Sequence, residues 1–363
     1  MTERVLPAGL DTPELVVDRD RLYANVLGLQ RTLADRGIRL RPHAKTHKSV
    51  RIGRLQVEAG AAGLTVGTLG EAEVFALAGL RDIFVAYPIW AEGPKAERVR
   101  ALHGSADLRV GVDSVAGAQR LGTAVKGMSR RLRVLVEIDP GLHRTGVSGP
   151  EAAVVVARAA KDAGLHVEGV FAHAGHSYAP GRAGAASLDE VSTLESAAEA
   201  LEADGFEIET ISAGSTPTRM LSGTGRVNEI RAGTYVLGDR QQVVLGAMEA
   251  DETAAVVVAT VVSEAGDRFV LDAGAKALTK DRPDWLPGFG DIEAYPDVVI
   301  EKLSDYHGVT RVPPLARRPR VGEQVAIVPN HICPVVDLVS TFTVVAPDGR
   351  IERWPVDARG RNG

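Results

Sequence analysis

The sequence predicts a (β/α)8 barrel of the TIM type followed by a second, mostly antiparallel β domain. Eight short apolar runs alternate with helix-like stretches between residues 38 and 238. Beyond residue 241 the pattern changes to β-branched, alternating segments. The length of 363 residues suffices for one large domain and a smaller one. We therefore expect a barrel over 19–240 and a β domain that consists of residues 241–363 together with residues 1–18.

The strands of the barrel are predicted from the apolar runs, which are 38–45, 63–68, 82–88, 108–114, 131–139, 166–175, 208–214 and 230–238. Between them, stretches such as 150–164 repeat apolar residues every three or four positions, as an amphipathic helix does, and many end in glycine. An open doubly wound sheet is the alternative. It is disfavoured because the first run leads into PHAKTHK rather than a GxGxxG turn.

The second domain is predicted from three segments, 253–278, 321–338 and 340–360, which are rich in valine and threonine and contain the turns EAGD and PDGR. The early segment ELVVDRD (14–20) can add a strand to this domain.

Composition excludes several classes of protein. A net charge of −5 disfavours a nucleic-acid-binding surface, and no apolar run reaches the roughly 18–20 residues of a membrane span. The start, MTERVLPAGLDTPELVV, lacks the apolar core of a signal peptide. The single cysteine, Cys333, allows no intrachain disulfide, so we expect a cytoplasmic protein.

Lys45 lies at the end of the first predicted strand, in RPHAKTHK. Side chains at the carboxyl ends of barrel strands face the active-site mouth, where a desolvated lysine can hold a Schiff base. A solvated loop lysine is the alternative, and position alone favours it.

A candidate anion site follows the seventh predicted strand, in SAGSTPTR (212–219). Gly214 permits a tight turn, and Ser215 and Thr216 precede Pro217 at a plausible first helical position. Helix N-termini bind anions, and barrels commonly bind phosphate after strands seven and eight. A plain capped helix is the equal alternative.

Two further loops carry polar side chains to the same rim. HAGHSY (173–178) brings His173, His176 and Tyr178 together after the sixth strand, a combination that favours function modestly. Arg144 follows the fifth strand and can hydrogen-bond a cofactor oxygen or a substrate carboxylate.

The candidate metal ligands are His331 and Cys333, in PNHICPVVD. In a strand, residues two apart point to the same side, and imidazole with thiolate suits zinc. Two protein ligands leave the shell open, as in catalytic sites. A buried cysteine beside an unrelated histidine is the alternative. His307 is a further histidine without an assigned role.

Together these residues resemble the family of D-threonine aldolases and D-serine dehydratases, pyridoxal-phosphate enzymes with an alanine-racemase-like barrel. The matching blocks run in the family's order along nearly the whole chain: DTPELVVD, RPHAKTHK, VEIDPGLHRTGV, HAGHSY, SAGSTPT, EIRAGTYVLGD, LDAGAKAL and PNHICPVVDL. One departure is Ala232, where the family pattern has proline.

The resemblance implies a role for each candidate. Lys45 carries the cofactor, Arg144 sits against the oxygen of its pyridine ring, and His331 with Cys333 binds a divalent metal, zinc or manganese. The remaining cofactor-binding residues are expected to be Tyr178, Gly214, Ser215, Thr216 and Tyr235. The resemblance also implies a homodimer acting on a small substrate, with no nucleic-acid or membrane partner.

The expected reaction is metal-assisted cleavage of a β-hydroxy-D-amino acid. Retro-aldol cleavage to glycine and an aldehyde comes first, because His176 can supply the base that removes the hydroxyl proton. Dehydration of D-serine or 3-hydroxy-D-aspartate is the alternative, because a cysteine two residues after the metal histidine is typical of the dehydratases.

Two other classes remain as alternatives. A racemase would need a second base on the opposite face of the ring and no metal. A non-catalytic carrier of pyridoxal phosphate would need no second domain, to which this chain gives about a third of its length.

Overall fold

The computed structural model describes residues 6–7 and 9–363, so part of the starting segment that we expect to lack a signal-peptide core lies outside the described residues. The described chain forms two compact units. The barrel unit contains residues 27–45, 52–233 and 360–363, and the β unit contains residues 46–51, 234–359 and the chain before residue 27. The chain therefore changes unit directly after Lys45.

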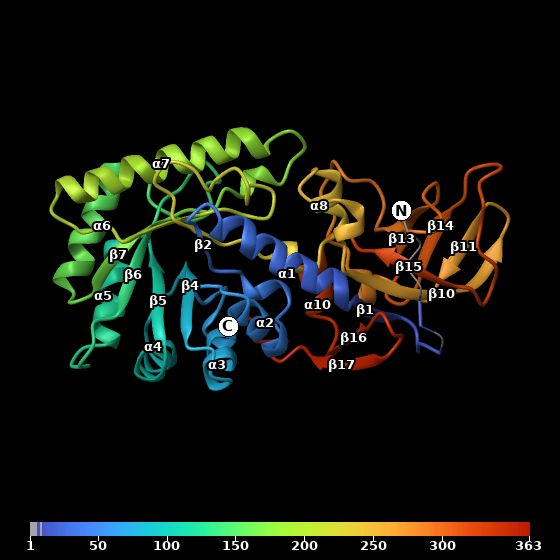
Figure 1. The fold of residues 1–363 in the computed structure, drawn as a ribbon, viewed down its shortest axis with the longest axis horizontal. Helices are drawn as coiled ribbons and strands as arrows, with labels where there is room; N and C mark the ends of the chain where they lie inside the picture. Colours follow the sequence, from blue (N-terminus) through green and yellow to red (C-terminus); the bar gives the residue numbers. More distant parts are fainter. Residues whose placement is uncertain (1–5, 8) are drawn as a thin grey trace. The chain divides into compact units, whose positions relative to one another are not determined.

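The barrel unit is built on eight parallel strands in the order β2-β9-β8-β7-β6-β5-β4-β3 (Figure 1). The ring closes where His43, just beyond β2, forms a parallel bridge with Thr65 of β3. All eight predicted strands are present, as β2 (Arg39–Leu40), β3 (Leu64–Val66), β4 (Asp82–Pro88), β5 (Asp107–Val112), β6 (Arg133–Glu137), β7 (His166–Phe171), β8 (Thr210–Ala213) and β9 (Glu229–Ile230).

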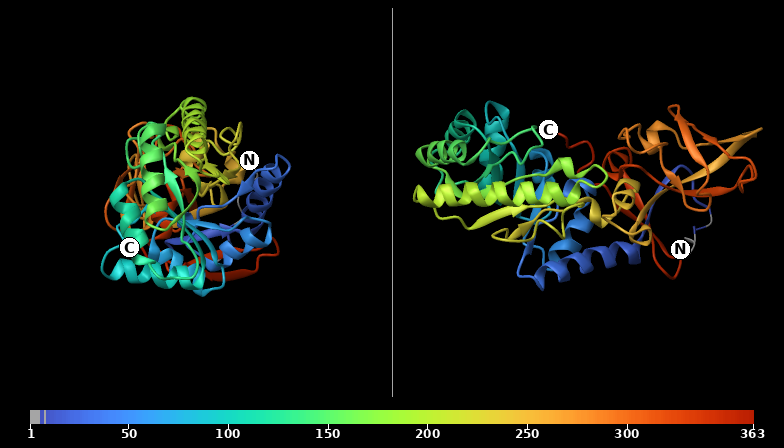
Figure 2. Two further views of the ribbon diagram at one scale, coloured as in Figure 1. Left: turned by 90° about the vertical axis from the view of Figure 1, so that its left-hand side faces the viewer. Right: turned by 90° about the horizontal axis from the view of Figure 1, so that it is seen from above.

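Helices cover the outside of this ring, as Figures 1 and 2 show. Their starts follow simple chemistry: the hydroxyl of Thr68 accepts from Glu71 N and that of Ser114 from Gly117 N, while Pro94 and Pro150 begin two others. The helices are α3 (Leu69–Leu77), α4 (Pro94–Ser105), α5 (Val115–Ala124), α6 (Pro150–Asp162) and α7 (Ala183–Ala203); α1 (Arg19–Ala34) and α2 (Val50–Glu58) span residues of both units.

The predicted helix start at Pro217 is wrong. Residues 216–221 form turns, and the chain reaches β9 without a helix. The hydroxyl of Thr218 accepts from Ser215 N at 3.0 Å. The backbone carbonyl of Thr218 accepts from Leu221 N and Ser222 N. Local side-chain bonds of this kind satisfy the backbone without a helix.

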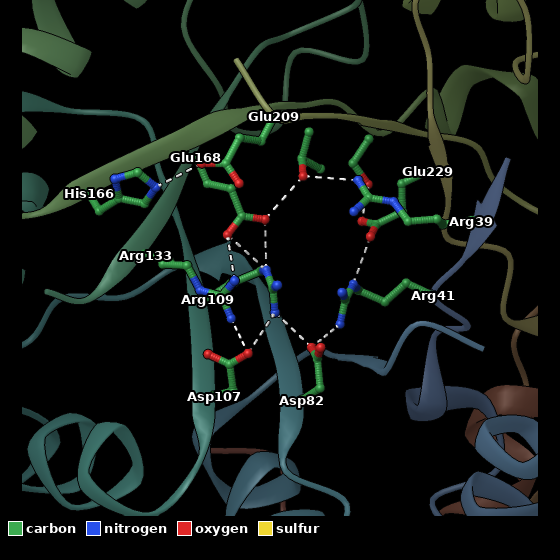
Figure 3. A network of polar contacts seen from close by, with 12 residues as sticks. Arg39, Arg41, Asp82, Asp107, Arg109, Arg133, His166, Glu168, Glu209 and Glu229 are labelled. Carbon is green, nitrogen blue, oxygen red and sulfur yellow. Dashed lines mark hydrogen bonds and ion pairs between the residues drawn. The ribbon is translucent and has the colours of Figure 1, made fainter. Parts of the chain in front are cut away.

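The interior of the barrel is apolar in the middle and charged at the amino ends of the strands. Phe84, Leu135 and Phe171 pack together in a buried cluster. Below them Arg41 and Arg109 connect acidic side chains of different strands (Figure 3). The N-terminal face of such a barrel serves stability, so this network closes the end opposite Lys45.

The β unit contains a nine-stranded sheet in the order β11-β14-β13-β12-β15-β10-β1-β16-β17. Every pairing is antiparallel except β1 with β16. The strands are β1 (Glu14–Asp18), β10 (Ala255–Ala265), β11 (Arg268–Leu271), β12 (Asp291–Ile292), β13 (Val299–Leu303), β14 (Gly308–Arg311), β15 (Gln324–Val328), β16 (Thr341–Val345) and β17 (Ile351–Pro355).

The core of the β unit lies along the central strands. Val16, Val256, Val258 and Ala326 pack together, and Trp354 is fully buried. Its short helical segments are α8 (Arg240–Val244), α9 (Ala275–Leu278) and α10 (Ile332–Val336). The predicted fold class, a barrel with a second antiparallel domain, is confirmed. In the described part of the chain, no helix is both long enough and apolar enough to span a membrane.

Candidate active site

Lys45 lies at the carboxyl end of the barrel, in the short helical turn η1 (Ala44–Thr46) that follows β2. Its side chain is exposed, and its backbone N–H points to His43 Nδ1 at 3.5 Å. Lysine at this position can react with a carbonyl compound that enters the barrel mouth.

The charge of Lys45 acts on two histidines of the barrel unit, His43 and His173. His43 and His173 are partly accessible, yet burial lowers the pKa of each well below its usual value. The positive charges of Lys45, Arg231 and Arg144 lower both pKa values further. Both imidazoles are therefore neutral at pH 7 and can accept as well as donate hydrogen bonds.

Arg231 is a buried cation that the sequence reading missed, because it stands in the apolar run of the last barrel strand. Its guanidinium donates to Ser212 Oγ at 2.6 Å and to the carbonyl of Ala172. It also lies over the rings of Phe171 and Phe84, at 5.3 and 5.9 Å from their centres. Burial lowers the pKa of Arg231, so a bound anion or ring acceptor would offset part of its desolvation.

Arg144 is exposed on a loop that the chain holds in a fixed shape. Thr145 Oγ1 donates to Glu137 Oε1 at 2.8 Å, and Gly146 N donates to Asp113 at 3.3 Å. Burial raises the pKa of Glu137, although Thr145 and Arg144 oppose this effect. The loop thus presents Arg144 beside the same group of charges as Lys45.

The predicted phosphate loop is compact and rich in hydroxyl groups. Gly214 has φ +87°, and a Cβ at this position would lie 2.9 Å from Ile230 Cδ1, so only glycine fits. Ser215 and Thr216 are buried, and Ser215 Oγ lies 3.1 Å from Ser177 Oγ of the neighbouring loop. Amide and hydroxyl donors gathered at the carboxyl end of β8 suit a phosphate group.

The HAGHSY loop contributes a third histidine. His176 lies in η2 (Gly175–Ser177), with Nε2 3.3 Å from Asp189 of α7. Its Nδ1 is buried and has no hydrogen-bond partner among the described residues. The ring of Tyr178 lies 6.4 Å from that of His173, centre to centre.

The two predicted metal ligands lie in the β unit. The expectation that they share a strand is wrong: β15 ends at Val328, His331 caps α10, and Cys333 lies in its first turn. The strand stops because Pro329 has no N–H for the ladder, and the buried carboxylate of Asp239 accepts from Ile332 N at 3.1 Å. The turn nevertheless leaves His331 and Cys333 side by side, within hydrogen-bonding reach.

The surroundings of this pair suit a divalent metal. His331 Nδ1 lies 2.5 Å from Asp281, which leaves Nε2 for another partner. Burial lowers the pKa of His331, but the negative charge of Cys333 and the hydrogen bond to Asp281 outweigh it and hold the pKa well above its usual value. A proton bound between these groups occupies the place that a metal cation can take.

The pair stands without a third protein ligand: in the part of the chain that the structure describes, no three His, Cys, Asp or Glu side chains form a metal-binding group. An open shell of two residues agrees with a site completed by water or substrate. Cys333 Sγ also lies within hydrogen-bonding distance of Thr46 Oγ1, at 3.3 Å, and Thr46 follows Lys45 in the chain.

The two remaining residues singled out from the sequence are Tyr235 and His307. Tyr235 lies buried in η3 (Thr234–Val236) of the β unit. His307 is exposed in the turn between β13 and β14, where its carbonyl accepts from Ser304 N.

The chain is similar to known proteins along nearly its whole length. Residues 17–241 match the family model described as alanine racemase, N-terminal domain, and residues 254–345 match the putative serine dehydratase domain. The chain is 34% identical to D-threo-3-hydroxyaspartate dehydratase of Delftia sp., over 95% of this chain and 97% of the relative. It is 32% identical to D-threonine aldolase of Arthrobacter sp., over 97% and 94% of the two chains.

Solved structures show the same similarity. The Delftia dehydratase superposes with a TM-score of 0.88 at 33% identity, covering 95% of this chain and 97% of that one. D-threonine aldolase of Filomicrobium marinum gives 0.89 at 30% identity, over 98% and 99%. The Delftia enzyme is also known as a histidine-to-alanine variant and as a variant of the cysteine two residues further on, the latter in a metal-free form. The chain therefore belongs to the alanine-racemase-like family of pyridoxal-phosphate enzymes, in the branch of the D-threonine aldolases and D-serine dehydratases.

Proposed function

We propose that this pyridoxal-phosphate-dependent lyase removes water from a β-hydroxy-D-amino acid with the help of a divalent metal, giving a 2-oxo acid and ammonia. The observation that carries the proposal is the pair of metal donors, an imidazole and a thiolate two residues apart. The Delftia dehydratase has a histidine and a cysteine at the same spacing, and its cysteine variant is a metal-free form.

The residues of the barrel mouth fit the cofactor. Lys45 would hold it, Arg144 would face its ring oxygen, and Gly214, Ser215 and Thr216 would bind its phosphate. When bound, pyridoxal phosphate supplies an electron sink for negative charge at Cα, and the metal supplies a Lewis acid for the β-hydroxyl.

A side chain of the protein must then remove one proton from Cα. Lys45 Nζ is the base that we assign to this step, because it is an exposed amine at the barrel mouth whose charge acts on both His43 and His173. The neutral rings of His43 and His173 beside it can accept or donate hydrogen bonds without adding positive charge. His331 and Cys333 would hold the metal, with Asp281 orienting the imidazole.

Retro-aldol cleavage is the second candidate. The sequence places it first, and one observation favours it: His176 is paired with Asp189 through Nε2 and keeps a buried, unpartnered Nδ1 that can take a hydroxyl proton. The donor pair, however, has the spacing of the histidine and cysteine of the Delftia dehydratase, and this moves dehydration ahead.

Product analysis separates the two reactions. The protein loaded with pyridoxal phosphate and zinc or manganese is incubated with D-serine, D-threonine and 3-hydroxy-D-aspartate, and with the L-enantiomers as controls. We expect pyruvate from D-serine and 2-oxobutyrate from D-threonine, each with equimolar ammonia. Glycine and acetaldehyde from D-threonine would reject dehydration and direct attention to His176.

The proposal also includes the location of the enzyme in the cell and its oligomeric state. We place the enzyme in the cytoplasm because its single thiol, proposed as a metal ligand, needs a reducing compartment. We also propose a homodimer that binds neither nucleic acid nor membrane. Light scattering of the loaded protein should give twice the mass of the chain, and a monomer at micromolar concentration would contradict the dimer.

A further inference from the structure

Glu190 of α7 is a fully buried carboxylate at the carboxyl end of the barrel. Its Oε1 accepts from the backbone N–H of Ala174 at 3.2 Å and from that of Gly214 at 3.1 Å. Its Oε2 accepts from Ser222 Oγ at 2.6 Å. A single side chain on an outer helix therefore reaches two loops of the barrel mouth.

These two loops are the ones that carry the candidate site. Ala174 follows His173 at the start of HAGHSY, and Gly214 precedes Ser215 of the phosphate loop. The loops touch again where Ser177 Oγ lies 3.1 Å from Ser215 Oγ. Since one carboxylate oxygen accepts from both backbones, it fixes the distance between them.

Burying the carboxyl group of Glu190 costs free energy, which indicates that the hydrogen bonds it accepts have a structural role. Its three hydrogen-bond donors are two backbone amides and a hydroxyl, none of which carries a full charge. Burial raises the pKa of Glu190, and the charge of Arg231 offsets this only in part. Without the carboxylate, two amide groups in buried loops would lose their acceptor, which is costly.

We infer that Glu190 is a positioning residue that shapes the phosphate-binding loop and ties it to the HAGHSY loop. It does not touch the reacting atoms. It acts through Gly214 and Ala174, which set the positions of Ser215 and His173 respectively. The inference rests on the proposed pyridoxal-phosphate site and adds a residue on which the affinity for its phosphate depends.

The test measures how much the phosphate contributes to cofactor binding. The apo-protein is titrated with pyridoxal phosphate and with pyridoxal, which lacks the phosphate. The ratio of the Kd for pyridoxal to the Kd for pyridoxal phosphate is then compared between variants. For Glu190→Ala we expect this ratio to fall at least about tenfold, with the Kd for pyridoxal changed less than about threefold. Glu190→Gln keeps an acceptor oxygen and should stay within about threefold of the wild-type ratio.

Glu195→Ala is the matched control. Glu195 lies on the same helix and accepts from Arg226 N at 2.8 Å, in a segment outside the candidate site, so its removal should leave the ratio unchanged. If Glu190→Ala does not fold, Glu190→Asp withdraws the carboxylate by one methylene and should lower the ratio similarly.

An unchanged ratio in the folded variant would overturn the inference, as would equal losses in the Gln and Ala variants. Failure of the wild-type protein to bind pyridoxal phosphate at all would instead reject the proposed function, and the two failures are therefore distinguishable.

Discussion

Glu168 of β7 is the acidic centre of the network that closes the amino end of the barrel (Figure 3). It is 3% exposed. Its two oxygens accept from Arg109 Nε at 2.8 and 3.0 Å, and it also contacts Thr210 Oγ1 at 3.0 Å and Arg133 at 3.2 Å. Removing one partner of a buried ion pair costs about 3–5 kcal/mol, because the remaining charge stays buried.

Glu168→Gln should therefore destabilise the barrel unit strongly. The amide keeps one acceptor oxygen but loses the charge opposite Arg109 and Arg133. For a unit of this size, each kcal/mol shifts Tm by about 2–4 °C, so we expect a decrease of roughly 6–20 °C in thermal unfolding followed by circular dichroism.

An exposed pair of the same chemistry provides the control. Glu202 binds Arg226 through both of its oxygens, but both side chains are more than one-third exposed. Such pairs contribute under about 1 kcal/mol, so Glu202→Gln should lower Tm by at most about 4 °C. Equal shifts in the two variants would refute the view that burial makes the Glu168 network important.

The remaining predictions concern the candidate site. Cys333→Ala should lower the bound metal, measured by elemental analysis, while cofactor absorbance stays; unchanged metal content would remove Cys333 from the site. Because His43 and His173 have lowered pKa values, the unfolded chain binds more protons below pH 6.5, and stability should fall with pH there. The loss is at most about 1.4 kcal/mol per histidine per pH unit. The apo-protein of a double His→Gln variant should show a flatter Tm between pH 7 and about 5.5, and parallel curves would contradict this. Gly214→Ala should weaken cofactor binding in a fluorescence titration, whereas Gly181→Ala, also at positive φ but with open space, should not; equal effects would make backbone strain alone responsible.

The barrel could be predicted from the sequence because strand and helix periods differ along the chain. The positions of Lys45 and of residues 214–216 at the barrel mouth were also predictable, since strand ends mark this face. The turn after β8 was not, because the side-chain bond that the Thr218 hydroxyl accepts from Ser215 N competes with the helix that the proline suggests.

Other parts of the site depend on tertiary packing. Arg231 directly follows β9 and Glu190 lies in α7, and the residue patterns there do not distinguish an inward polar side chain from a solvent-facing one. The same ambiguity hides the Glu168 network, whose members start neighbouring strands. The candidate pair His331 and Cys333 was chosen by residue type, but the helical turn that holds it was not predicted, because Asp239, which accepts from Ile332 N, lies far away in sequence.

The most direct test of the account is to identify the lysine that binds the cofactor. The loaded protein is reduced with borohydride, which fixes pyridoxal phosphate to the amine that holds it, and the modified peptide is sequenced by mass spectrometry. We predict modification of Lys45 alone, absent in Lys45→Ala. Stoichiometric modification of another lysine, or none in a protein that is otherwise folded, would contradict the central claim.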